Sequence, residues 1–436
     1  MQYTRDQIIT LAPDEASAKA GLQLATGSKW VVKAGNSKAL WGDCQGSGKT
    51  PYKTIVDLTN IAFKCSCPSR KFPCKHGLGL MLLYAQHPGA FAVETEPPPH
   101  VTEWLGKREE KAEKPQQKEE KPVDEAGKTK RAEARTKKVN AGIEELRGWI
   151  KDVVRAGIMN VPQQAYQFSE TITARMVDAQ AGGLANQLRQ INKINFFKEG
   201  WQRQLIKRLS AIYLITEAYK NADRLPADMV TTLQTLIGWT QAKEEVLQRT
   251  PVADTWLILS VTTTEEGNIT TEKIWLYGSS TARFALVLNF YAGGQGQQQL
   301  LMPGMHIKAD VVYFPGAAQW RALIKEYQQV ETAIALTVLA EDMETVYTLI
   351  TQQLVQNPFT EQIPFLLGNA RLVVTGNAWF LGDENGLGCA VANTDDECWR
   401  MLAFSKGMSF TCFCIYENEQ IVIHTLLAGD KMCFVR

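Results

Sequence analysis

The sequence predicts a multidomain α+β protein, and three observations lead to this fold class. Residues 103–138 contain 21 charged side chains among 36, which separates a small N-terminal region from the rest of the chain. Apolar residues then recur at helical spacing over 141–250, whereas β-branched and aromatic runs dominate after residue 251. We therefore expect a small N-terminal module, a helical middle segment and a sheet-rich α+β C-terminal region.

Length and composition indicate several folded domains. The chain has 436 residues, of which 45% are hydrophobic and 21% charged. This composition excludes a collagen, a wholly disordered chain and a small disulfide scaffold. The N-terminus lacks a secretory signal, and the longest apolar run, near residues 78–85, is far below the roughly 18 residues that span a bilayer. We expect a cytoplasmic protein with no membrane partner, whose nine cysteines are thiols or metal ligands.

Charge is polarised along the chain, although the formal net charge is only +1. Residues 1–250 carry 37 basic and 27 acidic side chains, a balance of +10, whereas residues 251–436 carry 10 and 19, a balance of −9. The net charge excludes a uniformly basic nucleic-acid binder, but it allows the N-terminal part of the chain to bind a partner through a basic surface. The acidic C-terminal half is expected to compete for that surface when no partner is bound.

We divide the chain into four segments. Residues 1–93 hold a strand region and a cysteine-rich module with a core at about 40–90. Residues 94–140 are expected to form a charged, disordered linker, because Pro115, Pro122 and Gly127 interrupt any helix there and few apolar side chains are present. Residues 141–250 form the helical region, and residues 251–436 form the acidic, sheet-rich α+β region.

Periodicity and breaker residues locate the elements beyond the linker. Helices are expected from residue 146, from Pro162 toward Gly182, over 201–219 and over 226–238. The C-terminal region should contain one helix around 320–340 that continues past Glu341, a solvated acidic loop at Asp395 with a packed Trp399 behind it, and eight strands. These strands are expected at 256–261, 274–277, 284–291, 311–314, 370–380, 388–392, 409–416 and 420–427, the last two joined as a hairpin.

One cluster of residues carries recognisable chemistry. Cys65 and Cys67 are followed after six residues by Cys74 and His76. Residues two apart in an extended segment point to the same side, so each pair can present two ligands to one ion. Three thiolates and one imidazole form a closed tetrahedral shell typical of one structural Zn²⁺ ion. The nearest substitute ligands, Cys44 and His87, are expected to be a packed thiol and a helix-end residue.

This spacing resembles the signature of SWIM zinc fingers, and the neighbouring residues 41–48 and 68–76 are similar to those of bacterial SWIM zinc-finger proteins. Residues 174–180 also resemble the middle region of these proteins, although less specifically. The resemblance implies a ββα zinc module that binds DNA or protein. It also implies partners such as MoxR-type AAA ATPases and von Willebrand A-domain proteins, and it implies no reaction.

Four basic side chains surround the ligands, and residues 58–93 contain no acidic side chain. These candidates for phosphate contact are Lys64, Arg70, Lys71 and Lys75. The alternative is that they only screen the thiolate cluster and solvate a small domain. The sequence leaves the two interpretations equally open.

Other motifs give no catalytic assignment. The glycines before Lys49 resemble part of a phosphate-binding loop, but Pro51 and an alternating strand pattern follow where that loop requires a helix. Cys412 and Cys414 have only His424 nearby, so core thiols are expected rather than a second metal site. The sequence favours a non-enzymatic adaptor for nucleic acid. The alternatives are a protein-binding component of an ATPase assembly and an enzyme with a site in the C-terminal half.

Overall fold

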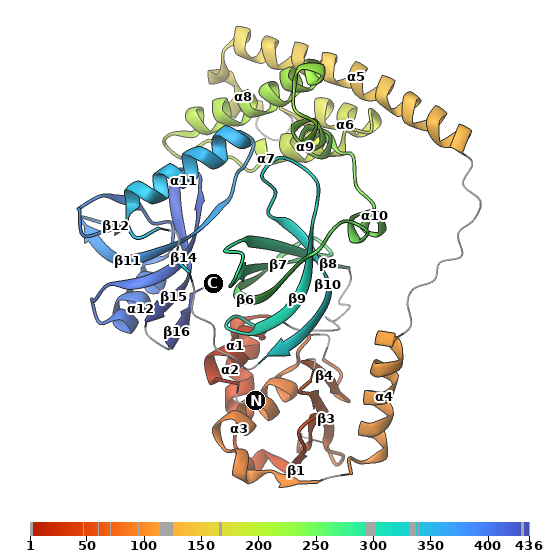
Figure 1. The fold of residues 1–436 in the computed structure, drawn as a ribbon, viewed down its shortest axis with the longest axis vertical. Coiled ribbons are helices and arrows are strands. Elements are labelled where there is room, and N and C mark those ends of the chain that lie inside the picture. The colour runs from red at the N-terminus through yellow and green to blue at the C-terminus, as the bar shows by residue number, and fades with distance from the viewer. Residues whose placement is uncertain are drawn as a thin grey trace.

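The computed structural model describes residues 3–46, 48–59, 61–69, 71–94, 96–113, 125–164, 168–292, 301–330, 337–338, 340–428 and 431–435. Its α+β architecture confirms the predicted fold class. Figure 1 shows the N-terminal module at the bottom, a β-barrel at the centre, a group of helices at the top and a second sheet unit at the left. None of the helices in these ranges has the length and apolar content needed to cross a bilayer.

The N-terminal module combines three helices with one sheet. Helices α1 (Arg5–Thr10) and α2 (Glu15–Leu24) precede the sheet, and α3 (Lys75–Gln86) follows its fourth strand. The sheet order is β4-β3-β2-β1-β5, with strands β1 (Trp30–Gly35), β2 (Ala39–Cys44), β3 (Tyr52–Asp57), β4 (Ala62–Cys65) and β5 (Ala92–Val93). Strands β3 and β4 with α3 form the expected ββα unit. Tyr52, just after the glycines that resemble part of a phosphate-binding loop, begins a strand rather than a helix.

The structure differs from the predicted linker at both of its ends. Helix α4 (Pro99–Glu113) lies along the N-terminal module, and α5 (Glu125–Ala156) leads into the helical region (Figure 1). Val101, Trp104 and Leu105 of α4 pack against the sheet side chains Trp41 and Ile55, which gives α4 an apolar face despite its charge. Residue 95 and residues 114–124 of the expected linker lie outside the described residues.

The middle region is helical, as predicted. Helix α5 packs with α6 (Glu170–Asp178), α7 (Gly182–Ile191), α8 (Trp201–Lys220) and α9 (Ala227–Ile237) around one apolar cluster. The apolar face of α8 is buried in this cluster and consists of Leu205, Leu209, Ile212 and Ile215. The short helix α10 (Lys243–Leu247) then leads to the barrel.

A five-stranded closed barrel follows, in the order β10-β8-β7-β6-β9. Its strands are β6 (Val252–Glu266), β7 (Ile269–Gly278), β8 (Phe284–Ala292), β9 (His306–Tyr313) and β10 (Arg321–Val330). The predicted helix is wrong at residues 321–330, because these residues pair antiparallel with β9 and parallel with β8 and so close the barrel. Its expected continuation past Glu341 corresponds to a helix at Met343–Gln356. Pairing with two strands overrides the local helix propensity of residues 321–330.

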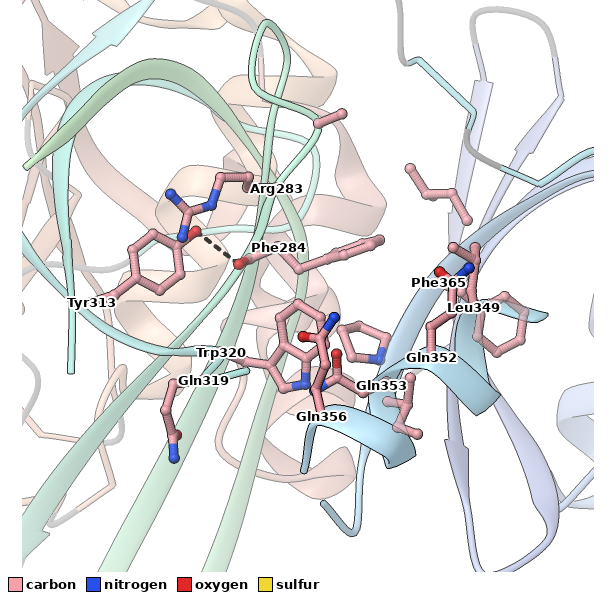
Figure 2. A pocket seen from close by; sticks show the side chains of 14 residues that line it. Arg283, Phe284, Tyr313, Gln319, Trp320, Leu349, Gln352, Gln353, Gln356 and Phe365 are labelled. Atoms are coloured by element: carbon pink, nitrogen blue, oxygen red, sulfur yellow. Dashed lines mark hydrogen bonds between the residues drawn. The ribbon is translucent and has the colours of Figure 1, made fainter. Parts of the chain in front are cut away.

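The C-terminal unit is a six-stranded sheet, in the order β13-β12-β11-β14-β15-β16, with two helices. The strands are β11 (Ile363–Thr375), β12 (Ala378–Gly382), β13 (Gly388–Ala390), β14 (Phe410–Glu417), β15 (Gln420–Ala428) and β16 (Lys431–Phe434), and the helices are α11 (Met343–Gln356) and α12 (Asp395–Ser405). The β14–β15 hairpin confirms the prediction. The barrel and this unit share an apolar cluster that includes Leu259, Trp275 and Phe413, close to the junction shown in Figure 2.

The acidic stretch at Asp395 is a helix start and not the predicted loop. Thr394 and Glu397 form a reciprocal capping box, and the carboxylates of the first turn suit the positive end of the helix dipole. Trp399 is 54% exposed, so the prediction that it is packed in the core is also wrong. Its one ring contact is an edge-on approach to Trp379, among the described residues.

The apolar core of the N-terminal module is continuous with that of the barrel. One cluster joins Ile8, Leu78 and Leu80 of the module to Trp256 and Ile307 of the barrel. Helix α1 links the two parts, because the Gln7 side-chain amide donates a hydrogen bond to the carbonyl of Pro303 at 3.2 Å. The zinc-finger region is therefore built into a larger folded unit.

Ion pairs connect the acidic C-terminal half to the helical region. Glu419, at the β14–β15 turn, contacts Arg203 at 2.7 Å and Lys207 at 3.5 Å, and Arg208 contacts Glu361 at 2.9 Å. In the described part of the chain, these carboxylates thus pair with the bundle and not with the basic N-terminal module.

Candidate metal centre

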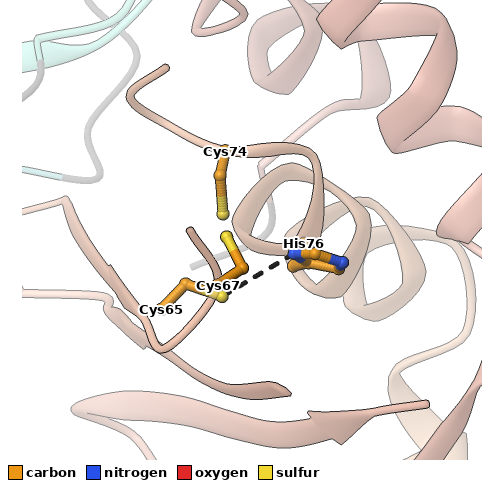
Figure 3. Close-up of side chains that lie close together, drawn as sticks. All are labelled: Cys65, Cys67, Cys74 and His76. Atoms are coloured by element: carbon orange, nitrogen blue, oxygen red, sulfur yellow. Dashed lines mark hydrogen bonds between the residues drawn. The ribbon is translucent and has the colours of Figure 1, made fainter. Parts of the chain in front are cut away.

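Two structural elements bring the four predicted ligands together. Cys65 ends strand β4 and Cys67 lies in the turn that follows, while Cys74 is the N-cap residue of α3 and His76 lies in its first turn. The turn and the helix start face each other, so the thiols and the imidazole point toward a common centre (Figure 3). The N-cap position also places the Cys74 sulfur at the positive end of the helix dipole, which favours a thiolate.

The geometry of this cluster suits a tetrahedral zinc ion. The ligand atoms of Cys65, Cys67, Cys74 and His76 all lie within 4.8 Å of one another. The Cys65 sulfur lies 3.7 Å from Nδ1 of His76, which identifies Nδ1 as the ring nitrogen that faces the centre. Zinc–sulfur bonds of about 2.3 Å in a tetrahedron place neighbouring ligand atoms about 3.5–3.8 Å apart. The residues therefore fit one structural Zn²⁺ ion.

Neighbouring side chains support the ligands. The Thr54 hydroxyl lies 3.4 Å from the Cys65 sulfur, and the ring of Tyr52 lies 4.9 Å from that of His76. Both residues belong to β3, and Thr54 is the register partner of Cys65. Sequence analysis missed these two residues, although pairing the alternating segment at residue 52 with the ligand strand would have placed Thr54 beside Cys65.

The thiols of the cluster influence one another strongly. A hydrogen bond from the Cys74 thiol lowers the pKa of Cys65 to about 3, against the opposing effect of burial. The same hydrogen bond and burial raise the pKa of Cys74, and burial raises that of Cys67. Binding of Zn²⁺ would displace the thiol protons of Cys67 and Cys74, so that these two residues and Cys65 would all hold the ion as thiolates.

The predicted basic residues divide into three groups. Lys64 and Lys75 are exposed, Lys71 pairs with Asp14 at 2.6 Å, and Arg70 lies outside the described residues. Lys53 is a basic residue that sequence analysis did not select, because it precedes the acid-free stretch. It lies beside His100 of α4, whose pKa is lowered by burial and then by the positive charges of Lys53 and Lys64.

The remaining cysteines agree with the predicted roles. Cys44 is fully buried in the core, and His87 is the C-cap residue of α3. Cys412 and Cys414 are fully buried with their sulfurs 3.4 Å apart. His424 instead lies 2.9 Å from the Ser260 hydroxyl, on the barrel side of the sheet. The burial of Cys412 and Cys414 confirms the expectation that they are core thiols.

Comparison with known proteins supports the assignment drawn from this geometry. Residues 64–85 match the family model of the SWIM zinc finger, and residues 134–237 match that of the SWIM-associated four-helix bundle domain. The second match covers α6 to α9 and much of α5. No curated protein and no solved structure matches the chain. The chain therefore contains a SWIM zinc finger, whose Cys₃His site fits one structural Zn²⁺ ion, followed by a SWIM-associated helical bundle.

Proposed function

We propose that this protein is a zinc-dependent, non-enzymatic adaptor that binds nucleic acid through the basic surface of its zinc module. The observation that supports this proposal is a set of three exposed lysines on the elements that form the zinc module, Lys53 of β3, Lys64 of β4 and Lys75 at the start of α3. None of the three forms an ion pair with another described residue. A cytoplasmic location, where the thiols remain reduced, belongs to the same proposal.

The charge balance favours a polyanionic ligand. Zn²⁺ with three thiolates has a charge of about −1, which the three lysines outweigh. Asp43 is a neighbouring acidic residue. Its negative charge raises the pKa of His100, whereas the positive charges of Lys53 and Lys64 lower it. Unpaired lysines can bind phosphates by releasing condensed counterions, so the affinity should fall steeply as salt increases. Four protein ligands leave no open position on the ion, which supports a structural rather than a catalytic role for zinc.

The first prediction concerns these lysines. Replacing Lys53, Lys64 and Lys75 together by alanine should weaken binding of the full chain to DNA. The slope of log affinity against log salt should fall by about 3 if each lysine contacts one phosphate. Fluorescence anisotropy with labelled single- and double-stranded oligonucleotides, from about 50 to 200 mM salt, measures both quantities.

A matched triple variant controls for the lost charge. Lys19, Lys38 and Lys198 are also exposed and lie outside the metal centre, so replacing them by alanine changes the net charge equally. This control should bind with the wild-type salt slope. Equal affinity of the two triple variants, or no binding of the wild type at about 50 mM salt, would contradict nucleic-acid binding through these lysines and favour a protein partner.

A protein partner is the second candidate, and exposed apolar residues on the bundle favour it. Phe197 is 100% exposed, and Ile206 and Leu214 of α8 are 50% and 49% exposed. Exposed apolar surface often marks an interaction site. We propose a MoxR-type AAA ATPase or a von Willebrand A-domain protein as this partner, from the resemblance of the finger sequence to proteins found beside them.

A second prediction tests that partner directly. Replacing Phe197 and Leu214 by aspartate should abolish co-elution of the full chain with a purified MoxR-type ATPase or von Willebrand A-domain protein from the same genome. The triple lysine variant should still co-elute. Wild-type protein that fails to co-elute with either candidate in nuclease-treated samples would contradict the proposal.

A further inference from the structure

Two adjoining hollows lie where the barrel meets the C-terminal unit and the bundle. The first is a cavity of about 230 Å³ between β8, α11 and β11, and Figure 2 shows the side chains that line it. The second, of about 400 Å³, lies between the start of α9 and the segment that follows β9. Arg283, Tyr313 and Gln319 line both hollows, so one ligand can occupy the two together. Their combined volume lies in the range of sites for small molecules.

The first hollow combines aromatic surfaces with side-chain amides. Phe284 and Trp320 meet edge to face, with ring centroids 6.2 Å apart. The amides of Gln319, Gln352 and Gln356 also line this hollow, and each amide offers both donors and an acceptor. The indole nitrogen of Trp320 is buried and has no hydrogen-bond partner among the described residues. This lining suits a flat ring with polar edges.

The second hollow is cationic. Arg249 and Arg283 line it, and neither forms an ion pair with a described residue. The guanidinium of Arg283 lies 4.1 Å from the centre of the Tyr313 ring, which orients it without neutralising its charge. Arginine remains charged at every physiological pH and binds phosphate in a bidentate manner. Asp228, in the first turn of α9, is the acidic residue that lines this hollow, and it can accept from hydroxyl groups of a ligand.

The backbone around Arg283 is held in place by hydrogen bonds. The buried carboxylate of Asp254 accepts from the backbone nitrogen of Thr281 at 2.8 Å and from the Thr281 hydroxyl at 2.7 Å. The Tyr313 hydroxyl donates to the carbonyl of Phe284 at 2.8 Å, as the dashed line in Figure 2 shows. Thr281 and Phe284, which precede and follow Arg283 in the chain, are thus held in place before any ligand arrives, which reduces the entropic penalty of binding.

We propose that the two hollows together bind a nucleoside monophosphate group. The base would lie against Phe284 and Trp320 with its edge at the glutamine amides, and the phosphate would lie between Arg249 and Arg283. Two unpaired guanidinium groups match a phosphate dianion better than a single carboxylate. Such a group occurs both in a free mononucleotide and at the 5′-phosphorylated end of a nucleic-acid strand. The site lies apart from the lysines of the zinc module, so it can be tested independently of the proposed function.

Isothermal titration calorimetry with the full chain tests the proposal. The probes are AMP, GMP, CMP and UMP, the corresponding nucleosides, and a short oligonucleotide with or without a 5′-phosphate. We expect at least one phosphorylated probe to bind with a dissociation constant of about 10–100 µM, a value reasonable for a ligand of this size. Arg283→Ala and Arg249→Ala should each weaken that binding about ten- to a hundredfold, and removal of the phosphate should have a similar effect.

Controls make each outcome decisive. Arg283 and Arg249 are exposed, so both variants should fold and melt like the wild type. Arg155→Ala removes another exposed arginine, which pairs with Asp152 and lines neither hollow, and it should leave the affinity unchanged. Binding of monophosphates identifies the free ligand, whereas binding of only the phosphorylated oligonucleotide identifies the strand end. The proposal is overturned if no phosphorylated probe binds at about 1 mM, well above the expected constant, or if Arg283→Ala binds like Arg155→Ala.

Discussion

Replacing Cys65 and Cys74 by serine should reduce the zinc content from about one ion per chain to none and unfold the N-terminal module. Structural zinc contributes an apparent free energy of about 10 kcal/mol or more in zinc-finger peptides, which is comparable to the total stability of a domain. Because the module shares its apolar core with the barrel, the barrel should also lose stability. Metal analysis together with hydrogen exchange of α3 and β6 measures both effects.

Cys44→Ser is the matched control for this experiment. Cys44 is the cysteine nearest to the ligands in the preceding sequence, and its thiol is fully buried. Its replacement buries a hydroxyl and should cost about 1–3 kcal/mol of stability without changing the zinc content. Unchanged zinc in the double ligand variant, or loss of zinc in Cys44→Ser, would refute the assigned ligand set.

Gly183→Ala should destabilise the helical bundle by about 3 kcal/mol. Gly183 lies in the first turn of α7, where the helix approaches the end of α9 closely. A Cβ atom at this position would overlap the carbonyl oxygen of Leu236 and lie 2.9 Å from the carbonyl carbon of Ile237. These atoms belong to the backbone, so the two helices would have to move apart. Hydrogen exchange of α7 and α9 in the full chain measures the change in opening free energy.

The preceding residue provides an unusually close control. A Cβ atom at Gly182 would meet nothing within 4 Å. Gly182→Ala should therefore be neutral or stabilise α7 by up to about 1 kcal/mol through helix propensity. Similar exchange rates in the two alanine variants would show that the α7–α9 approach is looser than the structure indicates.

Short-range patterns made the metal centre predictable. All four ligands lie within twelve residues, and the local geometry of a strand end and a helix start is sufficient to bring them together. The helices of the bundle were predictable for a similar reason, because a buried stripe repeats within each helix. The prediction that residues 174–180 resemble the middle region of SWIM proteins agrees with the bundle match. The bacterial subgroup remains a prediction.

Features that depend on distant residues were not predictable in this way. Residues 321–330 have a composition that suits a helix, but they close the barrel as a strand through parallel pairing with the more distant β8, in addition to the hairpin with β9. Helix α4 is highly charged overall, and its apolar face has a partner only because the module sheet presents Trp41 and Ile55. The hollow with Arg249 and Arg283 is assembled from separate segments spread between residues 227 and 319, so no local motif indicates it.

The continuous core of the N-terminal module and the barrel has a consequence for how the chain folds during synthesis. Residues 3–93 leave the ribosome long before residues 252–330, and the helical bundle is synthesised between them. The bundle therefore resembles an insertion into one composite folding unit. The N-terminal module of that unit can complete its core only after the barrel has been synthesised. A nascent or truncated chain that ends before residue 252 would expose the apolar side chains of α1 and α3 that normally contact the barrel. The excised finger is consequently a poor substitute for the whole chain in experiments and a natural client for chaperones.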